Sequence, residues 1–399
     1  MELNEKQKQG LDIAVARYKA GEAYTIISGY AGTGKSTLVK FIISALPDIN
    51  PEKDVVYTSF TGKATQVLAK KGNKNTSTLH KLLFISHPKA DGTYIRIPVT
   101  TIPYKIVVVD EISMVPDSLM RKLASYDVHV IGLGDPFQLP PINKNEDNHL
   151  LDNPHIFLDE IMRQEEGNEI IDLSMKIRKG ESIDYFKGKN VQIISKEELN
   201  TGMLQWADQI LVATNETRKN INSQMRDLLG HHGGPEDGDK IICYRNYWED
   251  ECCGGSALVN GTIGTIKNSY SSFVRIPGFL NKANFGQPRQ VDIICCDFIE
   301  KDGEEYKNLR MDKNMILTGE KTLDWKTEYA VSQNKKYRGL LPYEFTYGYA
   351  ITTHRSQGSE WDKVLVIEEK FPFNEEEHAR WLYTAVTRCA DKLVLVRSK

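Results

Sequence analysis

The strongest chemical signal in the sequence is a glycine-rich octapeptide near its start. Residues 29–36 are Gly-Tyr-Ala-Gly-Thr-Gly-Lys-Ser, which matches the G-x-x-x-x-G-K-S pattern of a phosphate-binding loop. Glycines let backbone N–H groups turn toward an anion, and a helix that follows adds the positive end of its dipole. We therefore expect Lys35 to contact the β- and γ-phosphates of a nucleotide and the Ser36 hydroxyl to ligate Mg²⁺.

Two carboxylates follow an apolar segment further along the chain. Residues 105–109 have the composition of a buried parallel strand, and Asp110 and Glu111 come directly after it. Beside a phosphate-binding loop, Asp110 would hold Mg²⁺ and Glu111 would orient and deprotonate the attacking water. The next apolar segment, 128–135, leads into a proline-rich loop from which Gln138 could donate to a γ-phosphate.

These groups need a scaffold, which the apolar segments supply. Residues 23–28 are predicted to form a strand and residues 37–43 a helix, so the loop has the strand–loop–helix context that it requires. Further strand patterns occur at 54–60, 209–214, 363–367 and 392–396. Strands that alternate with helices in this way predict an α/β fold with parallel sheets.

Two segments do not fit that alternation. Residues 84–103 carry an Asp91-Gly92 turn signal and are predicted to form a projecting β-hairpin. Residues 238–341 contain short strand patterns separated by turn signals, which predict a small β-barrel inserted into the second half of the fold.

Several polar residues allow two interpretations. The amide of Gln7 offers one donor and one acceptor to the edge of an adenine, but a solvated surface glutamine would have the same surroundings in the sequence. Helices are predicted to start after Thr61 and Thr78, and such positions either bind a phosphodiester backbone or cap the helix.

Composition sets broad limits. The chain has 399 residues, enough for two or three domains, and its 51 basic against 54 acidic residues give a net charge of −3. Overall charge therefore gives no support for nucleic-acid binding, and any such site must be a local groove. The six cysteines lack C-x-x-C spacing, which favours reduced structural thiols over a metal site. Because no apolar segment approaches membrane-spanning length, we expect a soluble cytoplasmic protein.

Taken in order, the motifs resemble those of a superfamily 1B DNA helicase of the RecD-like and Dda-like family, over nearly the whole chain. Gln7 resembles the Q motif, and Phe60 stands in motif Ia where proline is more usual. The other segments are similar to motif I (29–36), Ia (60–64), Ib (78–80), II (110–114), III (134–141), IV (158–164), a motif near the start of the barrel (259–264), V (349–360) and VI (382–388).

The resemblance implies two RecA-like P-loop domains with ATP between them. Domain 1A would comprise residues 1–83 and 104–160, with residues 84–103 as the 1B pin hairpin; domain 2A would comprise 161–240 and 342–399, with 241–341 as an SH3-like domain 2B. Arg163 and Arg388 resemble the arginine fingers of the family. The family moves 5′ to 3′ along single-stranded DNA and unwinds duplex DNA.

The resemblance also implies site residues, with ATP and Mg²⁺ as cofactors. The catalytic residues would be Lys35, Glu111, Gln138, Arg163 and Arg388, and the metal ligands Ser36 and Asp110. The ATP-binding residues would be Gln7, Gly29, Ala31, Gly32, Thr33, Gly34, Lys35, Ser36, Thr37 and Glu360. The DNA-binding residues would be Phe60, Thr61, Lys63, Thr78, His80, Tyr94, Thr353, His354, Ser356 and Gln357.

Expected partners are single-stranded DNA and duplex junctions, without a membrane. The protein would be a monomer in the cytoplasm of a bacterial or phage-infected cell, and could act with replication, repair or recombination proteins.

Three other functions remain open at this point. A P-loop kinase or GTPase would lack the arginine-bearing second half, and a GTPase would need an Asn-Lys-x-Asp segment, which is absent from the sequence. A non-catalytic DNA-binding module would not need Lys35, Asp110 and Glu111. A relative that moves along RNA, has reversed polarity, or strips proteins from a strand without much unwinding is closer, because contacts to the 2′-hydroxyl cannot be recognised from motifs.

Overall fold

The computed structural model describes residues 2–88, 94–140, 149–160, 168–247, 257–301, 303–370 and 374–397, without the side chains of 86–88 and 94. The chain divides into two compact units. Unit 1 comprises residues 1–84, 98–213 and 356–399, and unit 2 comprises residues 85–97 and 214–355.

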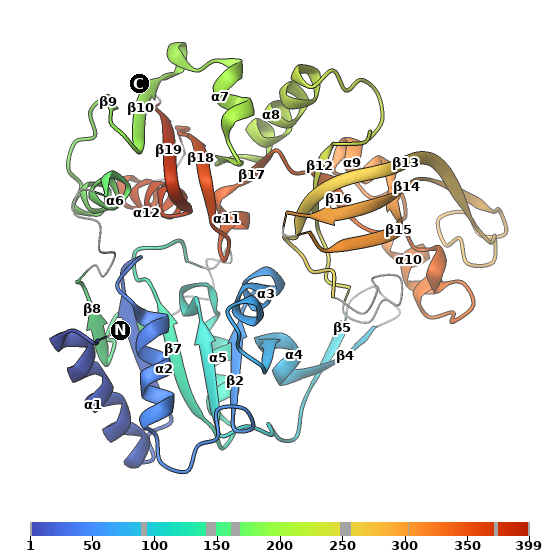
Figure 1. Cartoon of the computed structure of the whole chain (residues 1–399). Coiled ribbons are helices and arrows are strands. Elements are labelled where there is room, and N and C mark those ends of the chain that lie inside the picture. Colours follow the sequence, from blue (N-terminus) through green and yellow to red (C-terminus); the bar gives the residue numbers. More distant parts are fainter. Residues whose placement is uncertain are drawn as a thin grey trace. The chain divides into compact units, whose positions relative to one another are not determined.

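The first sheet of unit 1 is parallel and carries the predicted phosphate chemistry (Figure 1). Its order is β3-β2-β6-β7-β1-β8. The strand bounds are β1 Tyr24–Gly29, β2 Val55–Ser59, β3 Thr76–Thr78, β6 Ile106–Asp110, β7 His129–Gly134 and β8 Ile156–Leu158. Because parallel strands end at one edge, the segments after β1, β2, β6 and β7 all leave the sheet on the same side, where ligands bind in open α/β sheets.

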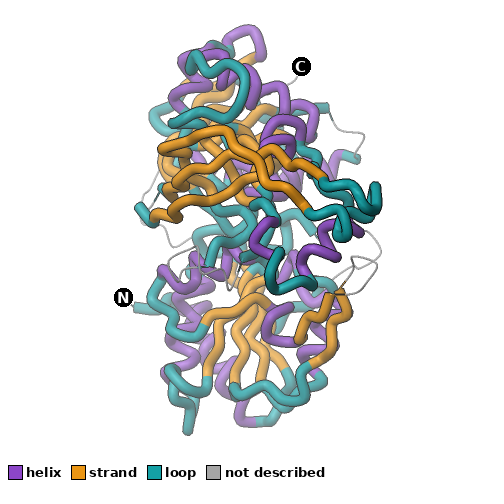
Figure 2. The backbone as a smooth tube through the Cα atoms, turned by 90° about the vertical axis from the view of Figure 1, so that its right-hand side faces the viewer, coloured by secondary structure: helices purple, strands orange, loops and turns teal. Residues whose placement is uncertain are grey.

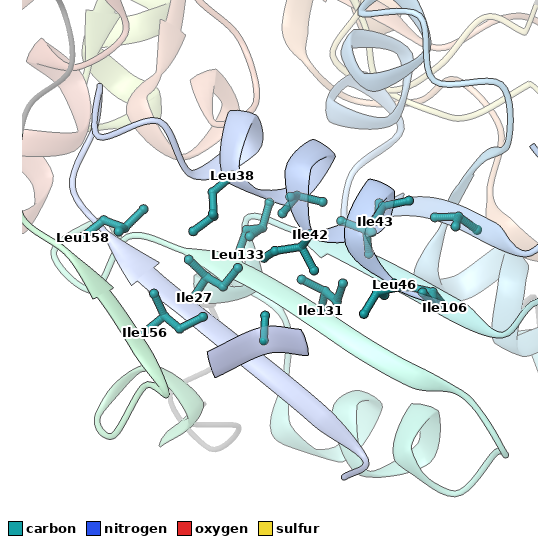
Figure 3. Packing of buried hydrophobic residues seen from close by; sticks show 14 residues of the cluster. Ile27, Leu38, Ile42, Ile43, Leu46, Ile106, Ile131, Leu133, Ile156 and Leu158 are labelled. Atoms are coloured by element: carbon teal, nitrogen blue, oxygen red, sulfur yellow. The ribbon is translucent and has the colours of Figure 1, made fainter. Parts of the chain in front are cut away.

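The strands of this sheet are buried on both faces, which explains their β-branched composition. On one face, α2 (Lys35–Ala45) lays Leu38, Ile42 and Ile43 against Ile27 and Ile131 (Figure 3). A second apolar cluster, which includes Val107, Val109 and Leu123, covers the other face. The sheet is therefore a rigid support for the loops at its edge.

The second sheet of unit 1 is also mainly parallel. Its strands β11, β18, β19, β10 and β9 follow one another in that order, and β9 is antiparallel to β10. The bounds are β9 Phe186–Lys187, β10 Val191–Ser195, β11 Gln209–Val212, β18 Trp361–Ile367 and β19 Cys389–Arg397. Trp381 of α12 (Glu375–Val386) is one of the largest side chains that are fully buried.

The remaining elements of unit 1 are mostly helices. They are α1 Glu5–Lys19, α3 Gly62–Lys70, α4 Leu79–Leu83, α5 Asp117–Ala124, α6 Glu169–Lys179 and α7 Thr201–Trp206, with short 3₁₀ helices at Ile112–Met114, His149–Leu151 and Lys196–Glu198.

Unit 2 contains a five-stranded antiparallel sheet with the order β15-β14-β13-β12-β16, whose strands are orange tubes in Figure 2. Its bounds are β12 Lys240–Cys243, β13 Ile263–Ile276, β14 Arg289–Glu300, β15 Glu305–Asp312 and β16 Phe345–Tyr347. The register shifts after Lys267, where Asn268 has a φ of 52°, and after Cys296. These bulges bend the long strands.

Unit 2 also contains several helices and a further short strand. They are α8 Asn215–Leu228, α9 Lys313–Thr318, α10 Trp325–Ser332, the 3₁₀ helix η5 Arg338–Leu340, β17 Ala350–Thr352 and α11 Thr353–Ser356, whose last residue belongs to unit 1. Strands β4 (Phe84–Pro88) and β5 (Tyr94–Pro98) pair as a separate two-stranded sheet. Asp239, fully buried, accepts hydrogen bonds from Arg226 and Tyr349 and so ties α8 to the sheet.

The prediction of an α/β fold with parallel sheets is confirmed by these two sheets, while the expected domain boundaries stay predictions. Four cysteines, Cys243, Cys295, Cys296 and Cys389, are buried and form no disulfide among the described residues, and Cys252 and Cys253 lie outside them. Among the described residues, no helix combines the length and apolar character needed to cross a membrane.

Candidate nucleotide-binding and catalytic site

The phosphate-binding loop connects β1 to α2 at the carboxyl edge of the first sheet. Gly32 and Gly34 have φ values of 77° and 80°. Residues that carry a Cβ adopt this left-handed conformation only at an energetic cost. A Cβ on Gly29 would lie 2.5 Å from the carbonyl oxygen of Leu158 in β8. Glycine is thus required at these positions. At Gly29 the reason is the close approach of β8, which the folded sheet brings next to β1.

Lys35, the first residue of α2, points its ammonium group back into the loop. Its Nζ atom donates to the carbonyl oxygens of Gly29 and Tyr30 at 2.7 and 2.8 Å. Burial lowers the pKa of Lys35, and the charges of Asp135 and Asp110 act in the opposite direction. An ammonium in a partly buried site, whose described hydrogen bonds go to neutral carbonyls, gains from an added anion, which fits a phosphate ligand.

Ser36 and Asp110, the two predicted metal ligands, line the same cavity of about 310 Å³. One Asp110 oxygen accepts from the backbone N–H of Glu111 at 3.0 Å. Burial raises the pKa of Asp110, so its ionised form would be stabilised by a nearby cation. A hydroxyl and a carboxylate at a phosphate-binding loop are the oxygen ligands that Mg²⁺ takes there, and the residues therefore fit the ion.

Glu111 joins the first sheet of unit 1 to Gly358 of the predicted motif V and to Arg388 of the predicted motif VI. Its φ of 54° turns the side chain out of the β6 direction. The Oε1 atom accepts from the backbone N–H of Gly358 at 3.0 Å and lies 3.7 Å from Nη1 of Arg388. The Oε2 atom is buried and has no hydrogen-bond partner among the described residues. One oxygen is thus fixed while the other can accept a hydrogen bond from water.

The surroundings also shift the acidity of Glu111. Burial raises its pKa, and Arg388 lowers it by favouring the carboxylate. Gly358 makes the contact possible, because its φ is 79° and a Cβ there would lie 2.7 Å from Cβ of Ala64. A larger residue at position 358 would separate Glu111 from its backbone donor.

Arg388 follows α12 and is only 8% exposed. Its Nη1 and Nη2 atoms donate to the Ser359 carbonyl and the Thr387 hydroxyl, both at a long 3.5 Å, while its Nε atom has no partner in the described parts of the chain. The structure therefore brings Glu111 and Arg388 together, and Lys35 lies close enough to both for their charges to act on its pKa, while the catalytic roles of the three residues stay predictions. Arg163 lies outside the described residues.

Tyr383 makes a contact that sequence reasoning missed. Its hydroxyl donates to Asp135 at 2.7 Å and accepts from the backbone N–H of Ala31 at 3.3 Å. Burial raises the pKa of Tyr383, so the hydroxyl stays protonated and keeps donating. Both Asp135 and Tyr383 lie inside segments recognised as motifs, but nothing in their spacing indicated that they would meet.

The predicted γ-phosphate contact Gln138 is 9% exposed and lies beside further links between the two sheets of unit 1. The neighbouring Leu139 donates its N–H to the Thr384 hydroxyl at 3.0 Å and accepts from the Gln357 amide at 3.2 Å. The other amide atom of Gln357, Oε1, is buried without a described partner. Residues of motifs III, V and VI therefore form one hydrogen-bonded layer.

Gln7 lies at the loop, although its amide is engaged within the protein. Its Nε2 atom donates to the Thr33 carbonyl at 3.3 Å, and its Oε1 atom accepts from the N–H of Asn4 at 3.2 Å in a capping box. The side chain is 2% exposed. The surface interpretation is therefore wrong, and an adenine contact remains a prediction.

The other predicted ATP-binding residues have varied surroundings. The Thr33 hydroxyl donates to the Tyr30 carbonyl at 2.9 Å, whereas Ala31 and Thr37 are half-buried and Glu360 is exposed. Sequence reasoning also missed Arg178 of α6, whose guanidinium carbon lies 3.4 Å from the centre of the Tyr30 ring. No motif contains Arg178, so no sequence signal pointed to this cation–π contact.

The predicted DNA-binding residues fall in both units. In unit 1, the hydroxyls of Thr61 and Thr78 cap α3 and α4, which is the simpler of the two interpretations left open by the sequence. The rings of Phe60 and His80 lie 5.4 Å apart, Lys63 is half-buried, and Ser356 and Gln357 are buried.

In unit 2, Thr353 is fully buried, and burial lowers the pKa of His354. The side chain of Tyr94 lies outside the described residues.

Replacing Glu111 with glutamine is expected to preserve nucleotide binding and to slow hydrolysis. The amide can still accept from Gly358 but cannot take a proton, a loss typically worth about 10²–10⁴-fold in rate. Nucleotide affinity and single-turnover hydrolysis measured on the same preparation test this, with Glu304→Gln, a half-buried glutamate of unit 2, as the control. A collapse of nucleotide affinity together with rapid residual turnover would make Glu111 a metal ligand instead.

Two protein-family models match the chain. Residues 2–196 match the family model described as "AAA domain", and residues 347–396 match the one described as "UvrD-like helicase C-terminal domain". The two models cover the two parts of unit 1 that supply Lys35 and Arg388.

Among curated proteins, the chain is similar to the ATP-dependent RecD2 DNA helicase of Deinococcus radiodurans, with 24% identity over 98% of this chain and 48% of that protein. It is also similar to the ATP-dependent DNA helicase dda of Enterobacteria phage T4, with 28% identity over 45% of this chain and 43% of that protein. The chain thus spans about half the length of the curated relatives that it matches.

Solved structures share the fold. The Pif1 helicase of Candida albicans aligns with a TM-score of 0.54 at 19% identity, over 100% of this chain and 95% of that one. A Bacteroides Pif1 helicase in complex with ADP-AlF3 and single-stranded DNA aligns with a TM-score of 0.52 at 18% identity, over 100% and 95% of the two chains. These structures show the shared fold, while the motifs, the two domain models and the curated relatives place the chain among the superfamily 1B helicases, with RecD-like and Dda-like relatives.

Proposed function

We propose that the protein is an ATP-dependent DNA helicase that moves 5′ to 3′ on single-stranded DNA and unwinds duplex DNA. The observation that carries this proposal is the contact of Glu111 with both Gly358 and Arg388, because it joins the phosphate-binding half of unit 1 to its arginine-bearing half. The proposed domains are 1A (1–83 and 104–160), 1B (84–103), 2A (161–240 and 342–399) and an SH3-like 2B (241–341).

In the proposed reaction, the phosphate-binding loop holds the β- and γ-phosphates, and the Lys35 ammonium exchanges its carbonyl partners for phosphate oxygens. Mg²⁺ held by Ser36 and Asp110 would neutralise charge on these oxygens. The unpartnered Oε2 of Glu111 accepts the proton of the attacking water, and Arg388 stabilises charge that develops on the γ-phosphoryl group. Gln138 is proposed to donate to the same group.

The location of Arg388 gives a physical basis for coupling hydrolysis to movement. Its guanidinium is held by two long hydrogen bonds and a distant carboxylate, so small shifts of the segment around α12 change its distance to the phosphates. Arg163 is proposed as a second such arginine. If hydrolysis requires both halves of unit 1 to close, each ATP cycle can alternate two grips on a strand.

The proposed strand-gripping residues are those of motifs Ia, Ib and V. Thr61 and Thr78 lie at helix starts, where backbone N–H groups attract phosphates, and Phe60 and His80 present neighbouring rings suited to stacking on bases. Gln357 would transmit strand contact to the nucleotide site, because its amide already contacts Leu139 of motif III. Lys63, Thr353, His354 and Ser356 are proposed to complete this set.

The hairpin of β4 and β5 is proposed as the pin that separates strands. Ile85, Ile95 and Ile97 are 54%, 44% and 48% exposed, which is unusual for isoleucine and supports an apolar surface for an opened base pair. Replacing Tyr94 with alanine is expected to preserve DNA-stimulated ATPase and translocation but to abolish unwinding, because stacking replaces part of the few kcal/mol lost when a pair opens.

Two measurements test the assignment of Tyr94. Unwinding of a forked duplex and ATPase with single-stranded DNA are compared for Tyr94→Ala, Ile95→Ala and a matched control, Tyr185→Ala, which removes an exposed tyrosine of unit 1. Wild-type unwinding by Tyr94→Ala would exclude it as the wedge. Equal loss of ATPase and unwinding would show a general structural defect instead.

One assay tests the proposed activity as a whole. Duplexes with either a 5′ or a 3′ single-stranded tail, each made with a DNA or an RNA tail, are incubated with protein, ATP and Mg²⁺. We expect unwinding of the 5′-tailed DNA substrate only. Unwinding only from the RNA tail, or ATPase without strand separation, would favour a translocase on RNA or one that strips proteins.

A further inference from the structure

Unit 2 contains a polar cavity of about 420 Å³ that the proposed reaction does not use. It is bordered by the segment after β12, by β15, by α10 and by the segment from η5 to Glu344. Its volume lies within the range of small-ligand sites, so it can accommodate a group larger than water. The arrangement of charge along its wall identifies the kind of ligand.

Most of the charged groups in this wall are already compensated. Arg245 pairs with Glu328 and Glu344 at 2.5 and 3.1 Å, and Lys321 pairs with the same two carboxylates at 3.1 and 2.7 Å. These four groups form a closed ring of alternating charge with no net charge. A further anion or cation has little to gain from binding to it.

The remaining carboxylate, Asp312, is committed to local structure. It accepts from the backbone N–H groups of Met315 and Thr322 at 3.2 and 2.8 Å and from the Thr322 hydroxyl at 2.7 Å. It is only 3% exposed, since it caps the start of α9. Its hydrogen-bonding capacity is therefore largely used within the protein.

Two guanidinium groups are left over. Arg310 and Arg338 both line the cavity, and neither has an ion pair or side-chain hydrogen bond within the described parts of the chain. Nη2 of Arg310 lies 3.9 Å from where a Cβ on Gly339 would be, next to Arg338 in the chain. Two like charges facing one cavity repel each other unless an anion lies between them, and guanidinium groups match phosphate oxygens in geometry.

A third donor lies in the same wall. The Tyr247 hydroxyl oxygen accepts from the backbone N–H of Glu344 at 2.8 Å, which leaves its own proton to donate. Burial raises the pKa of Tyr247, so that proton is retained. Its ring lies 4.7 Å from that of Tyr343, centre to centre, which fixes its position.

We propose that this cavity binds a phosphate group, held by the guanidinium groups of Arg310 and Arg338 and by the Tyr247 hydroxyl. The proposal does not depend on the proposed helicase activity. The group can come from free phosphate or a nucleotide, or from a nucleic-acid strand, and the chemistry is the same in each case. The test below distinguishes these sources.

Phenylglyoxal, which modifies accessible arginine side chains, gives a local test on the full chain with the ATP site saturated by a non-hydrolysable analogue and Mg²⁺. Labelling rates of Arg310 and Arg338 are measured by mass spectrometry in chloride, in inorganic phosphate and with oligothymidylate, at equal ionic strength. We expect about tenfold slower labelling in inorganic phosphate, in oligothymidylate or in both. One hydrogen bond to a charged group changes a binding constant by about that factor.

The labelling conditions distinguish the possible sources of the phosphate group and the results that would contradict the proposal. Protection by inorganic phosphate indicates a free phosphate or nucleotide, whereas protection by oligothymidylate alone indicates a strand. In Arg310→Gln, the ligand concentration that half-protects Arg338 should rise about tenfold, whereas the control Lys307→Gln, on the same strand β15 and exposed, should match wild type. Slow labelling already in chloride, equal labelling in all arms, or unchanged protection in Arg310→Gln would overturn the proposal.

Discussion

Replacing Lys35 with alanine is expected to abolish ATP turnover while leaving the fold intact. Within the described residues, the ammonium group donates hydrogen bonds to the Gly29 and Tyr30 carbonyls and has no ion pair, so the fold loses two hydrogen bonds to the backbone. The reaction loses the cation nearest the β- and γ-phosphates. Removal of one preorganised donor typically reduces kcat about 10²–10³-fold, and a buried charge adds to that.

DNA-stimulated ATP hydrolysis and thermal unfolding followed by circular dichroism check this prediction together. Lys8→Ala is the matched control, because Lys8 is an exposed lysine on α1 whose ion pair within the described residues is with Glu5, one turn away. Near-normal turnover in a folded Lys35→Ala protein would show that residues 29–36 do not bind the hydrolysed phosphates. Loss of the unfolding transition would make the variant uninformative about chemistry, and Lys35→Met would then replace it.

Much of the nucleotide site could be predicted because its parts have local signatures. The loop from Gly29 to Ser36 has fixed spacing, and the acids at 110 and 111 follow a β-branched strand whose carboxyl end must meet the loop edge. The parallel register, which pairs Ser59 with Asp110 and Ser28 with Gly134, brings the four segments to one edge. The apolar pattern of the strands and the order of the motifs along the chain were enough to predict that these segments meet at one edge of the sheet.

The contacts that join the two halves of unit 1 could not be predicted in the same way. Glu111 and Gly358 are 247 positions apart, and Asp135 and Tyr383 are 248 apart. No spacing rule connects such residues, because their approach depends on how two sheets and α12 pack. The stacking of Arg178 on Tyr30 is of the same kind, since neither the arginine nor its helix carries a motif.

The antiparallel part of the chain was predicted less fully for a different reason. Turn signals such as Asn260-Gly261 indicated short strands, but β13 and β14 are long and continue through bulges at Asn268 and after Cys296. A bulge shifts the alternation of inward and outward residues by one position, so a period-two pattern is interrupted where the strand itself continues. The cavity beside Arg310 and Arg338 likewise depends on three segments that only the fold brings together.

Replacing Arg388 with alanine is expected to lower kcat about 10³-fold or more, with little change in nucleotide affinity, by analogy with arginine fingers in other P-loop enzymes. Arg388 lies 3.7 Å from Oε1 of Glu111 and has only two long hydrogen bonds. Removing the Arg388 side chain should therefore lower the free energy of unfolding only slightly, compared with the rise in the free energy of the transition state. Arg388→Lys keeps the charge but loses the planar fork, and we expect it to recover only part of the rate.

A double-mutant cycle separates catalysis from the positioning of Glu111. If Arg388 and Glu111 act on one transition state, Arg388→Ala combined with Glu111→Gln should be much less impaired than the product of the two single effects predicts. Single-turnover hydrolysis with DNA present gives the rates, and Lys392→Ala, which removes an exposed lysine of β19, is the control. Wild-type turnover in Arg388→Ala would reduce Arg388 to an ion-pair partner. Strictly multiplicative effects would place the two residues in separate steps, so that Arg388 governs closure of the site and Glu111 the transfer of the proton.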